Sequence, residues 1–175
     1  FSAGNSGHVG QNTNYHSYQA SQYTITAGAV DSSGSLAYFS TPGATVLTSA
    51  PGVGVYTTDS QGGAGYTSGD YTYISGTSFS APAVAGVAAL MLEANPDLGY
   101  RDVQEILAYS SSNPIDSTSG WQTNGALNWN GGGLTVHDGY GFGMTDAHAA
   151  VRLAETWEAQ STYGNLFSMS GSSSP

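Results

Sequence analysis

The sequence predicts an α/β fold in which short strands surround a buried central helix. Its 175 residues suit a single domain. Segments with the two-residue period of strands fill the first part of the chain, and a helix that is apolar on nearly every side follows them. Apolar residues make up 39% of the chain, although charged residues make up only 8%. This apolar content favours a packed domain over a disordered chain.

Four segments in the first half of the chain are predicted strands. In residues 22–30 (QYTITAGAV) the larger apolar residues alternate with Thr and Gly. The other candidates are 36–39, 45–49 and 71–75, which Pro-Gly pairs and a Gly-rich stretch separate. We interpret the Tyr-rich stretch at 66–73 as a half-buried strand rather than a carbohydrate-binding surface.

The central helix is predicted over residues 79–95. Five alanines and several larger apolar residues leave it almost no polar face, so we expect it to be buried. Pro82 falls in the first turn, where a missing N–H is tolerated, and an Asn-Pro pair ends the helix. Gly86 lies inside it, where glycine costs about 1 kcal/mol relative to alanine. We therefore expect another segment to pack closely against Gly86.

Two further helices and a hairpin are predicted after the central helix. Residues 100–110 form an amphipathic helix with its aliphatic residues inward and its charged residues, Asp102 among them, outward. Residues 121–137 are predicted to form a hairpin around an Asn-Gly-Gly-Gly tip. The third helix is predicted over 146–157, with Thr145 as its N-cap.

Beyond residue 157 the chain loses its periodicity and ends in a Gly/Ser-rich stretch. That composition is typical of linkers. We therefore divide the chain into a folded part over 1–157 and a linker or tail over 158–175, and a further domain downstream is a possible partner.

The charge balance excludes several kinds of partner. Twelve acidic side chains and two basic ones give a net charge of −10. Nucleic acids and anionic membranes both need a basic surface, so we expect neither as a partner. The chain has no Cys, which excludes disulfides and thiolate chemistry. The polar, weakly charged composition favours a secreted or extracellular protein, and a bacterial one.

The segment SGTSFSAP at 75–82 places one hydroxyl at the start of the buried helix. A helix N-terminus carries unpaired N–H groups and a partial positive charge. There Ser78 can attack a carbonyl while its own N–H stabilises the resulting oxyanion. The nucleophile elbow of α/β-hydrolases is disfavoured, because it needs Gly two residues after the Ser and this chain has Ser80. The plain alternative is that Ser78 is only an N-cap.

The string GTSFSAPAVAGVAALMLEANPDLGYRDVQ, which begins at Gly76, resembles the subtilase family of serine peptidases, in particular its kexin/furin-like branch. Three more segments resemble that family in the same order: SAGNSG at 2–7, WQTNG at 121–125 and YGFGMTDA at 140–147. The resemblance implies that 1–157 is the C-terminal half of a subtilase catalytic domain. The implied fold is α/β, the C-terminal part of a subtilisin-like three-layer domain with a mainly parallel sheet and a buried central helix that begins at the nucleophile Ser.

The resemblance also implies roles for individual residues. Ser78 would be the nucleophile, and Asn5 would donate a side-chain N–H to the oxyanion together with the Ser78 backbone N–H. The implied substrate-binding residues are Ser2, Ala3 and Gly4, which would line the primary specificity pocket, with Gly76 and Thr77. The implied activity is that of a serine-type endopeptidase, which hydrolyses polypeptide substrates through an acyl-enzyme.

The Asp and His of the triad precede the oxyanion Asn in subtilases, and only four residues precede Asn5 here. We therefore expect both to come from a missing N-terminal half, which is then the principal partner, and we expect the fragment alone to be inactive. The four histidines are interpreted as structural or binding residues rather than as the missing base. A catalytically silent subtilase-like scaffold or binding module stays open as the alternative. An adhesive Gly/Ser-rich segment is disfavoured, because it would not contain this string at the start of one buried helix.

Two departures from the kexin/furin branch bear on specificity and metals. Those enzymes carry acids after the oxyanion Asn that bind calcium and the basic side chain of a substrate, and residues 8–18 contain none. Thr41 stands where another calcium-binding Glu is expected. The sequence therefore predicts cleavage next to apolar or small side chains rather than paired basic ones. No cofactor is required for the chemistry and no metal ligands are assigned, although the Asp31, Asp59 and Asp70 loops leave structural calcium possible.

Overall fold

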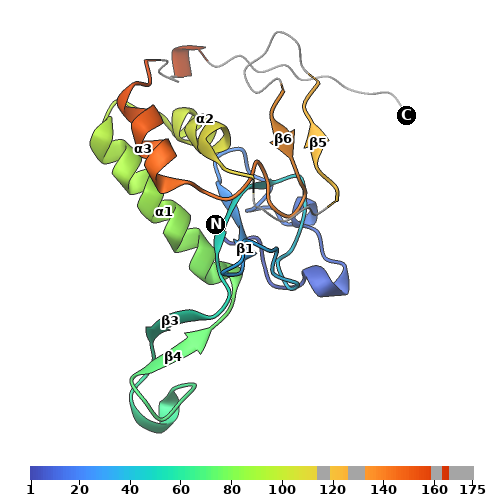
Figure 1. Ribbon diagram of the computed structural model, residues 1–175, viewed down its shortest axis with the longest axis vertical. Helices are drawn as coiled ribbons and strands as arrows, with labels where there is room; N and C mark the ends of the chain where they lie inside the picture. Colours follow the sequence, from blue (N-terminus) through green and yellow to red (C-terminus); the bar gives the residue numbers. More distant parts are fainter. Residues whose placement is uncertain (114–118, 126–132, 159–162, 166–175) are drawn as a thin grey trace.

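The computed structural model describes residues 1–113, 119–125, 133–158 and 163–165 (Figure 1). The helices are α1 (Thr77–Ala94), α2 (Tyr100–Ser110) and α3 (Ala147–Glu155). The strands are β1 (Thr26–Val30), β2 (Val46–Pro51), β3 (Val55–Thr58), β4 (Tyr71–Ile74), β5 (Gln122–Thr123) and β6 (Thr135–Val136). Short 3-10 turns lie at Gly7–Val9, Thr13–Tyr15, Gly62–Ala64 and Tyr163–Asn165.

A small parallel sheet forms the centre of the fold. Strands β1 and β2 pair in parallel, and every residue of β1 is buried. Parallel bridges extend the sheet on both sides, from Ser2 to Ala27 and from Ser49 to Met144. A strand that is buried on both faces reads as a continuous run of small and apolar residues. The sequence TAGAV of β1 has this character.

Helices α1 and α2 pack on this sheet, and α3 packs on both of these helices (Figure 1). Helix α1 packs on β1, β2 and α3, and α2 packs on β2 and α3. The core between them consists of small and aliphatic side chains: Ala27, Ala50, Val84, Met91, Leu98, Val103, Ile106, Leu107, Ala150 and Ala154. This arrangement is an α/β fold with α1 as its central helix, as predicted.

The burial of α1 differs from the prediction. Its buried residues all lie on the face toward the sheet: Thr77, Ser80, Val84 and Met91. Leu90 is 50% exposed and Leu92 is 41% exposed. A Cβ added at Gly86 would meet no atom within 4 Å, so the expected close packing there is not found among the described residues. Helix α1 is also long enough and apolar enough to cross a membrane, by length and composition alone. Its inner face, however, belongs to the core.

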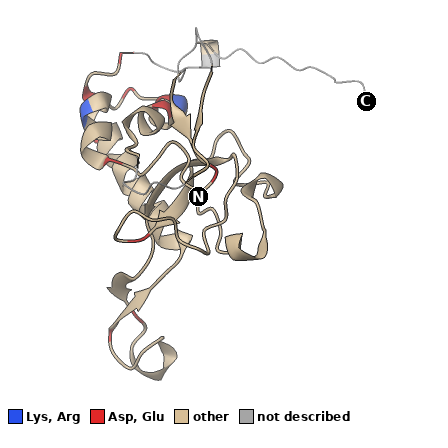
Figure 2. Cartoon of the chain, turned by 45° about the vertical axis from the view of Figure 1, so that its right-hand side comes forward, with Lys and Arg blue, Asp and Glu red and all other residues tan. Residues whose placement is uncertain are grey.

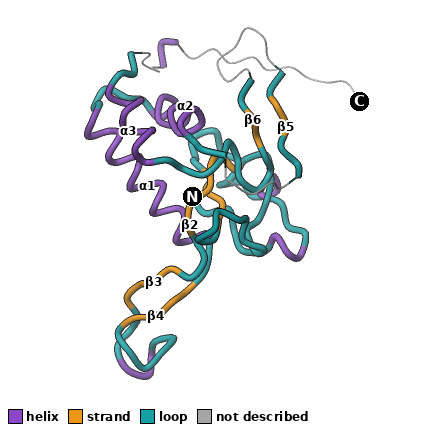
Figure 3. The backbone as a smooth tube through the Cα atoms, viewed as in Figure 1, coloured by secondary structure: helices purple, strands orange, loops and turns teal. Residues whose placement is uncertain are grey.

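One predicted strand is not formed, and one strand of the structure was not predicted. Residues 36–39 make only a single bridge, between Val30 and Leu36, because the Asp31 carboxylate ties the backbone N–H groups of Ser33 and Ser35 into a tight turn. Strand β3 was not predicted. It pairs antiparallel with β4 in a hairpin that projects from the body of the fold (Figure 3).

The tyrosines of this hairpin are exposed, so the interpretation of 66–73 as a half-buried strand is wrong for its aromatic residues. Tyr71 is 55% exposed, and Tyr66 and Tyr73 are more exposed still. Instead of packing on the core, Tyr71 and Tyr73 pack on Tyr56 across the hairpin, with ring centroids 5.5 and 4.9 Å apart. Cross-strand aromatic pairs of this kind stabilise a hairpin that lacks a core face.

Helix α2 has the predicted bounds, but Asp102 points inward instead of outward. Its buried carboxylate accepts hydrogen bonds from the Gly99 N–H at 2.7 Å and from the Trp157 indole N–H at 3.2 Å. The first bond caps α2 and the second ties the end of α3 to it. The N-cap of α3 is Asp146, whose carboxylate accepts from the Ala149 N–H, and not Thr145. The Thr145 hydroxyl instead hydrogen-bonds to that of Thr48 in β2.

The predicted hairpin over 121–137 is present as the antiparallel pair β5 and β6, and its tip at 126–132 lies outside the described residues. The predicted tail over 158–175 also lies mostly outside them. The division of the chain at residue 157 therefore stays a prediction.

Replacing Asp102 tests its inward role. Asp102→Ala leaves the first turn of α2 uncapped and the Trp157 N–H without this acceptor, and we expect the free energy of unfolding to fall by about 1–3 kcal/mol in a urea titration. Asp97→Ala, at an exposed position just before α2, is the matched control and should change it by less than about 0.5 kcal/mol. Equal effects of the two substitutions would contradict the inward role.

Candidate active site

The loop that carries Asn5 lies against the start of α1. Backbone hydrogen bonds between Ala27 and the first residues of the chain fix this loop to β1, with Ala3 N–H to Ala27 O at 3.0 Å. The Gly4 N–H then donates to the Thr77 hydroxyl at 3.1 Å. Gly4 has φ +107°, a backbone conformation that favours glycine. The fold thus joins two segments that lie more than 70 residues apart in the sequence.

Thr77 fixes the orientation of the Asn5 carboxamide. The Asn5 Oδ1 accepts from the Thr77 N–H and from the Thr77 hydroxyl, both at 2.9 Å. The Thr77 side chain is fully buried. Because the oxygen of the amide is held on the inner side, its NH₂ group is presented on the other side. Among the described residues no hydrogen-bond acceptor pairs with this NH₂ group, and none pairs with the Ser78 N–H.

The two unpaired donors lie close together. A Cβ built on Gly76 would be 3.3 Å from the Asn5 Nδ2 and 3.8 Å from the Ser78 backbone nitrogen. Both Asn5 and Ser78 are exposed. The donors also lie at the N-terminus of α1, which carries a partial positive charge. This arrangement can bind an oxyanion that forms on a carbonyl attacked by the Ser78 hydroxyl.

The first turn of α1 is anchored to the end of β2. The Gly76 N–H donates to Gly52 O at 2.8 Å, and the buried Ser80 hydroxyl donates to Ala50 O at 3.0 Å. A Cβ on Gly52 would lie 2.4 Å from the Ser80 Oγ and 2.8 Å from the Ala29 Cβ, so only glycine fits there. The position of Ser78 therefore depends on the parallel sheet and not on the local turn alone.

The positive character of this site comes from the backbone. The two basic side chains of the chain, Arg101 and Arg152, lie on α2 and α3 (Figure 2). No histidine of the described residues hydrogen-bonds to Ser78. The described residues also contain no group of three or more His, Asp or Glu side chains that could hold a metal ion.

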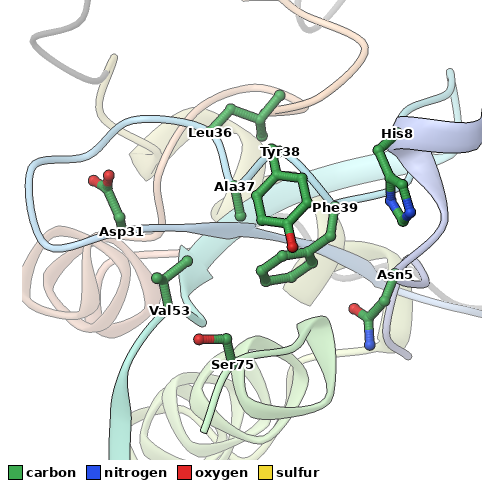
Figure 4. A pocket seen from close by; sticks show the side chains of 9 residues that line it. All are labelled: Asn5, His8, Asp31, Leu36, Ala37, Tyr38, Phe39, Val53 and Ser75. Atoms are coloured by element: carbon green, nitrogen blue, oxygen red, sulfur yellow. The ribbon is translucent and has the colours of Figure 1, made fainter.

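A pocket of about 570 Å³ opens beside Asn5 (Figure 4). Asn5 and Ser75 lie on the side where α1 begins, and aromatic and aliphatic side chains form most of the remaining wall. The lining residues are Asn5, His8, Asp31, Leu36, Ala37, Tyr38, Phe39, Val53 and Ser75. Hydrogen bonds from the Ser33 hydroxyl and neighbouring N–H groups hold the pKa of the Asp31 carboxyl below its ordinary value. This carboxylate is therefore ionised, but it already accepts hydrogen bonds from Ser33 and Ser35 in the adjacent turn.

The predicted site residues are only partly brought together at this pocket. Asn5 lines it, whereas Ser2, Ala3 and Gly4 do not. The buried side chain of Thr77 cannot face a substrate, so any contact with one would involve its backbone. Sequence reasoning missed the aromatic wall at Tyr38 and Phe39, because these residues follow a turn and carry no motif. The roles assigned to all of these residues stay predictions.

The comparisons with known proteins agree on one family. A model of the subtilase family of peptidases matches residues 1–143. Kexin of Candida albicans is 36% identical over 161 residues, which span 90% of this chain and 16% of kexin. The human proprotein convertase subtilisin/kexin type 7 is 36% identical over 163 residues, which span 89% of this chain and 20% of the convertase. The structure of a serine protease of Aeromonas sobria matches 87% of this chain and 32% of its own, at TM-score 0.75 and 25% identity.

The chain therefore belongs to the subtilase family, with relatives among the kexins and proprotein convertases. Its fold and sequence correspond to part of a subtilisin-like serine protease. It spans a fifth or less of the length of the two curated relatives.

The role of Thr77 in holding Asn5 can be tested through stability. Thr77→Val leaves the Gly4 N–H without its acceptor and Asn5 Oδ1 with one donor, so we expect the free energy of unfolding to fall by about 1–3 kcal/mol. Thr77→Ser keeps the hydroxyl and should recover most of this loss. Thr57→Val, in the projecting hairpin, is the control. Equal losses in Thr77→Val and Thr77→Ser would show that the hydroxyl is not what matters.

Proposed function

We propose that this chain is the C-terminal portion of the catalytic domain of a serine endopeptidase, with Ser78 as nucleophile. The observation that carries the proposal is the pair of unpaired N–H donors, from Asn5 Nδ2 and the Ser78 backbone, beside an exposed Ser78 in a chain of the subtilase family. The substrate is a polypeptide. The Asp and His of the triad belong to the preceding, N-terminal half of the domain, which is the partner of this chain.

In this mechanism the histidine of the N-terminal half removes the proton of the Ser78 hydroxyl as Oγ attacks the scissile carbonyl. The carbonyl oxygen becomes an oxyanion and accepts hydrogen bonds from Asn5 Nδ2–H and Ser78 N–H. The amine leaves with the proton, and water then hydrolyses the acyl-enzyme by the same route. One side-chain donor of this type stabilises the transition state by about 3–4 kcal/mol, a magnitude measured in a subtilase and carried over here.

The pocket beside Asn5 supports a preference for apolar or small substrate side chains. Leu36, Tyr38, Phe39 and Val53 contribute to its wall, and the one acid that lines it, Asp31, is engaged by its own turn. A basic side chain bound there would find no free carboxylate among the lining residues. Secretion of the protein is a further part of the proposal, supported by the composition of the chain.

The nucleophile can be tested on the complete protein that contains this chain. A serine-reactive phosphonate should label Ser78, and Ser78→Ala should abolish labelling, whereas Ser60→Ala in the hairpin loop should not. Asn5→Ala should lower kcat by about 100- to 1,000-fold with little change in KM, since the oxyanion exists only along the reaction path. A folded complete protein that is not labelled at Ser78 would support the silent scaffold or binding module instead.

Substrate preference is tested by profiling cleavage of a peptide library with the complete protein. We expect apolar or small residues to dominate next to the scissile bond. Tyr38→Asp, which places an unengaged carboxylate on the pocket wall, should shift the profile toward basic side chains. A wild-type profile dominated by Arg before the scissile bond would overturn the proposed preference.

A further inference from the structure

One short segment, Leu36 to Phe39, forms much of the wall of the pocket beside Asn5 (Figure 4). This segment is not a strand of the sheet. A single bridge, between Leu36 and Val30, joins it to β1. The width of the pocket therefore depends on the other contacts that hold Leu36 in place.

The segment that follows β6 contacts Leu36 from outside the pocket. The Leu36 N–H donates a hydrogen bond to the Tyr140 hydroxyl at 2.8 Å, across 104 positions of the sequence. Gly139 lies directly against the Leu36 side chain. A Cβ built on Gly139 would be 2.3 Å from the Leu36 Cδ2 and 3.2 Å from its Cδ1. Neither Gly139 nor Tyr140 lines the pocket itself. Leu36 thus connects the pocket to this distant segment.

Tyr140 is held firmly by its surroundings. Its side chain is fully buried. Trp121 stacks on its ring with the centroids 5.6 Å apart, and the His137 ring packs on it edge to face at 5.1 Å. Aromatic packing of this kind fixes the ring, and a buried hydroxyl needs a hydrogen-bond partner. The Tyr140 hydroxyl is therefore a fixed acceptor that positions the Leu36 backbone.

The backbone at Gly139 is fixed as well. Its carbonyl oxygen would lie 2.6 Å from a Cβ built on Gly28, so this segment is in close contact with the backbone of β1. Three residues later the Phe142 N–H donates to Leu47 O in β2 at 2.9 Å. The φ of Gly139 is not among the positive values that favour glycine. Space, and not backbone conformation, therefore favours glycine here, because a side chain at 139 would displace Leu36 toward the pocket.

We propose that Gly139 and Tyr140 are positioning residues that act through Leu36 to set the width of the pocket, and thereby the size of the apolar substrate side chain that it accepts. This inference rests on the proposed function, which assigns the pocket to a substrate side chain. One methylene group too many in an apolar pocket changes discrimination by about 10- to 200-fold. A small displacement of Leu36 is therefore enough to change the substrate preference.

A binding experiment tests this role without catalysis. It uses the complete protein that contains this chain, with Ser78→Ala, and fluorescein-labelled alanine hexapeptides in which one leucine occupies each position in turn. Fluorescence anisotropy should show that leucine at one position binds more tightly than alanine. Gly139→Ala should raise the Kd of that leucine peptide by about tenfold and leave the Kd of the all-alanine peptide within about twofold. Gly63→Ala, whose added Cβ meets no described atom within 4 Å, is the matched control and should change neither Kd.

A second substitution removes the hydrogen bond alone. Tyr140→Phe deletes the acceptor of the Leu36 N–H but keeps the ring packed on Trp121 and His137. By mass spectrometry, we expect hydrogen–deuterium exchange of the backbone amides at 36–39 to become at least about tenfold faster. The leucine peptide should also bind more weakly, whereas the all-alanine peptide should be little affected. Tyr109→Phe, which deletes a hydroxyl from α2, is the control and should change neither measurement.

The active form of the complete protein separates this inference from the proposed function. Gly139→Ala should raise KM for the matching leucine substrate by about tenfold with kcat unchanged, because Leu36 lies in the pocket wall and not at the reacting atoms. A protein in which Gly139→Ala weakens leucine binding, but which cleaves no peptide, contradicts the proposed activity alone.

Three results would overturn the positioning role. The first is a starting protein that shows no preference for leucine at any position. The second is leucine binding that Gly139→Ala and Tyr140→Phe leave unchanged. The third is an equal loss of binding for the leucine and all-alanine peptides, which would show that the two residues serve only the stability of the fold.

Discussion

The candidate site depends on one set of hydrogen bonds, those that Thr77 makes to the loop carrying Asn5. The Thr77 backbone and hydroxyl both donate to Asn5 Oδ1, and the same hydroxyl accepts from Gly4. The Thr77 side chain is fully buried, and a buried polar group without a partner is costly. These bonds therefore fix the orientation of the Asn5 amide. The direction of the proposed oxyanion donor, the Asn5 NH₂ group, is set by what the amide oxygen binds on the inner side.

Much of this architecture can be read from the sequence, because it depends on local patterns. The two-residue alternation predicts β1, the aliphatic spacing predicts α2 with its bounds, and the apolar run predicts α1. Asp102 and Thr145 were misplaced because one partner of Asp102, Trp157, and the partner of Thr145, Thr48, are more than 50 residues away in the sequence. Local charge and capping rules cannot anticipate such bonds. A helical position that appears suited to solvent can instead serve a distant segment.

The candidate site also has a part that the sequence predicts and a part that it does not. Ser78 and Asn5 were identified from a resemblance between whole segments, and the geometry beside Gly76 could not be deduced from either segment alone. The pocket wall at Tyr38 and Phe39 has no motif, since it depends on how a turn after β1 folds back toward α1. The burial of Thr77 could not be predicted from the sequence either, because a threonine beside a nucleophile is equally suited to facing a substrate.

The double role of α1 has a kinetic consequence. Its first turn carries Ser78 and its inner face belongs to the core, and an unbroken helix of 18 residues connects them. Such a helix moves as a rigid rod, so tilting one end displaces the other. In the proposed endopeptidase, assembly of the two portions of the domain and completion of the catalytic centre are then one cooperative event. If the portions are separated by a nick, activity should rise with the product of their concentrations and show no partly active intermediate.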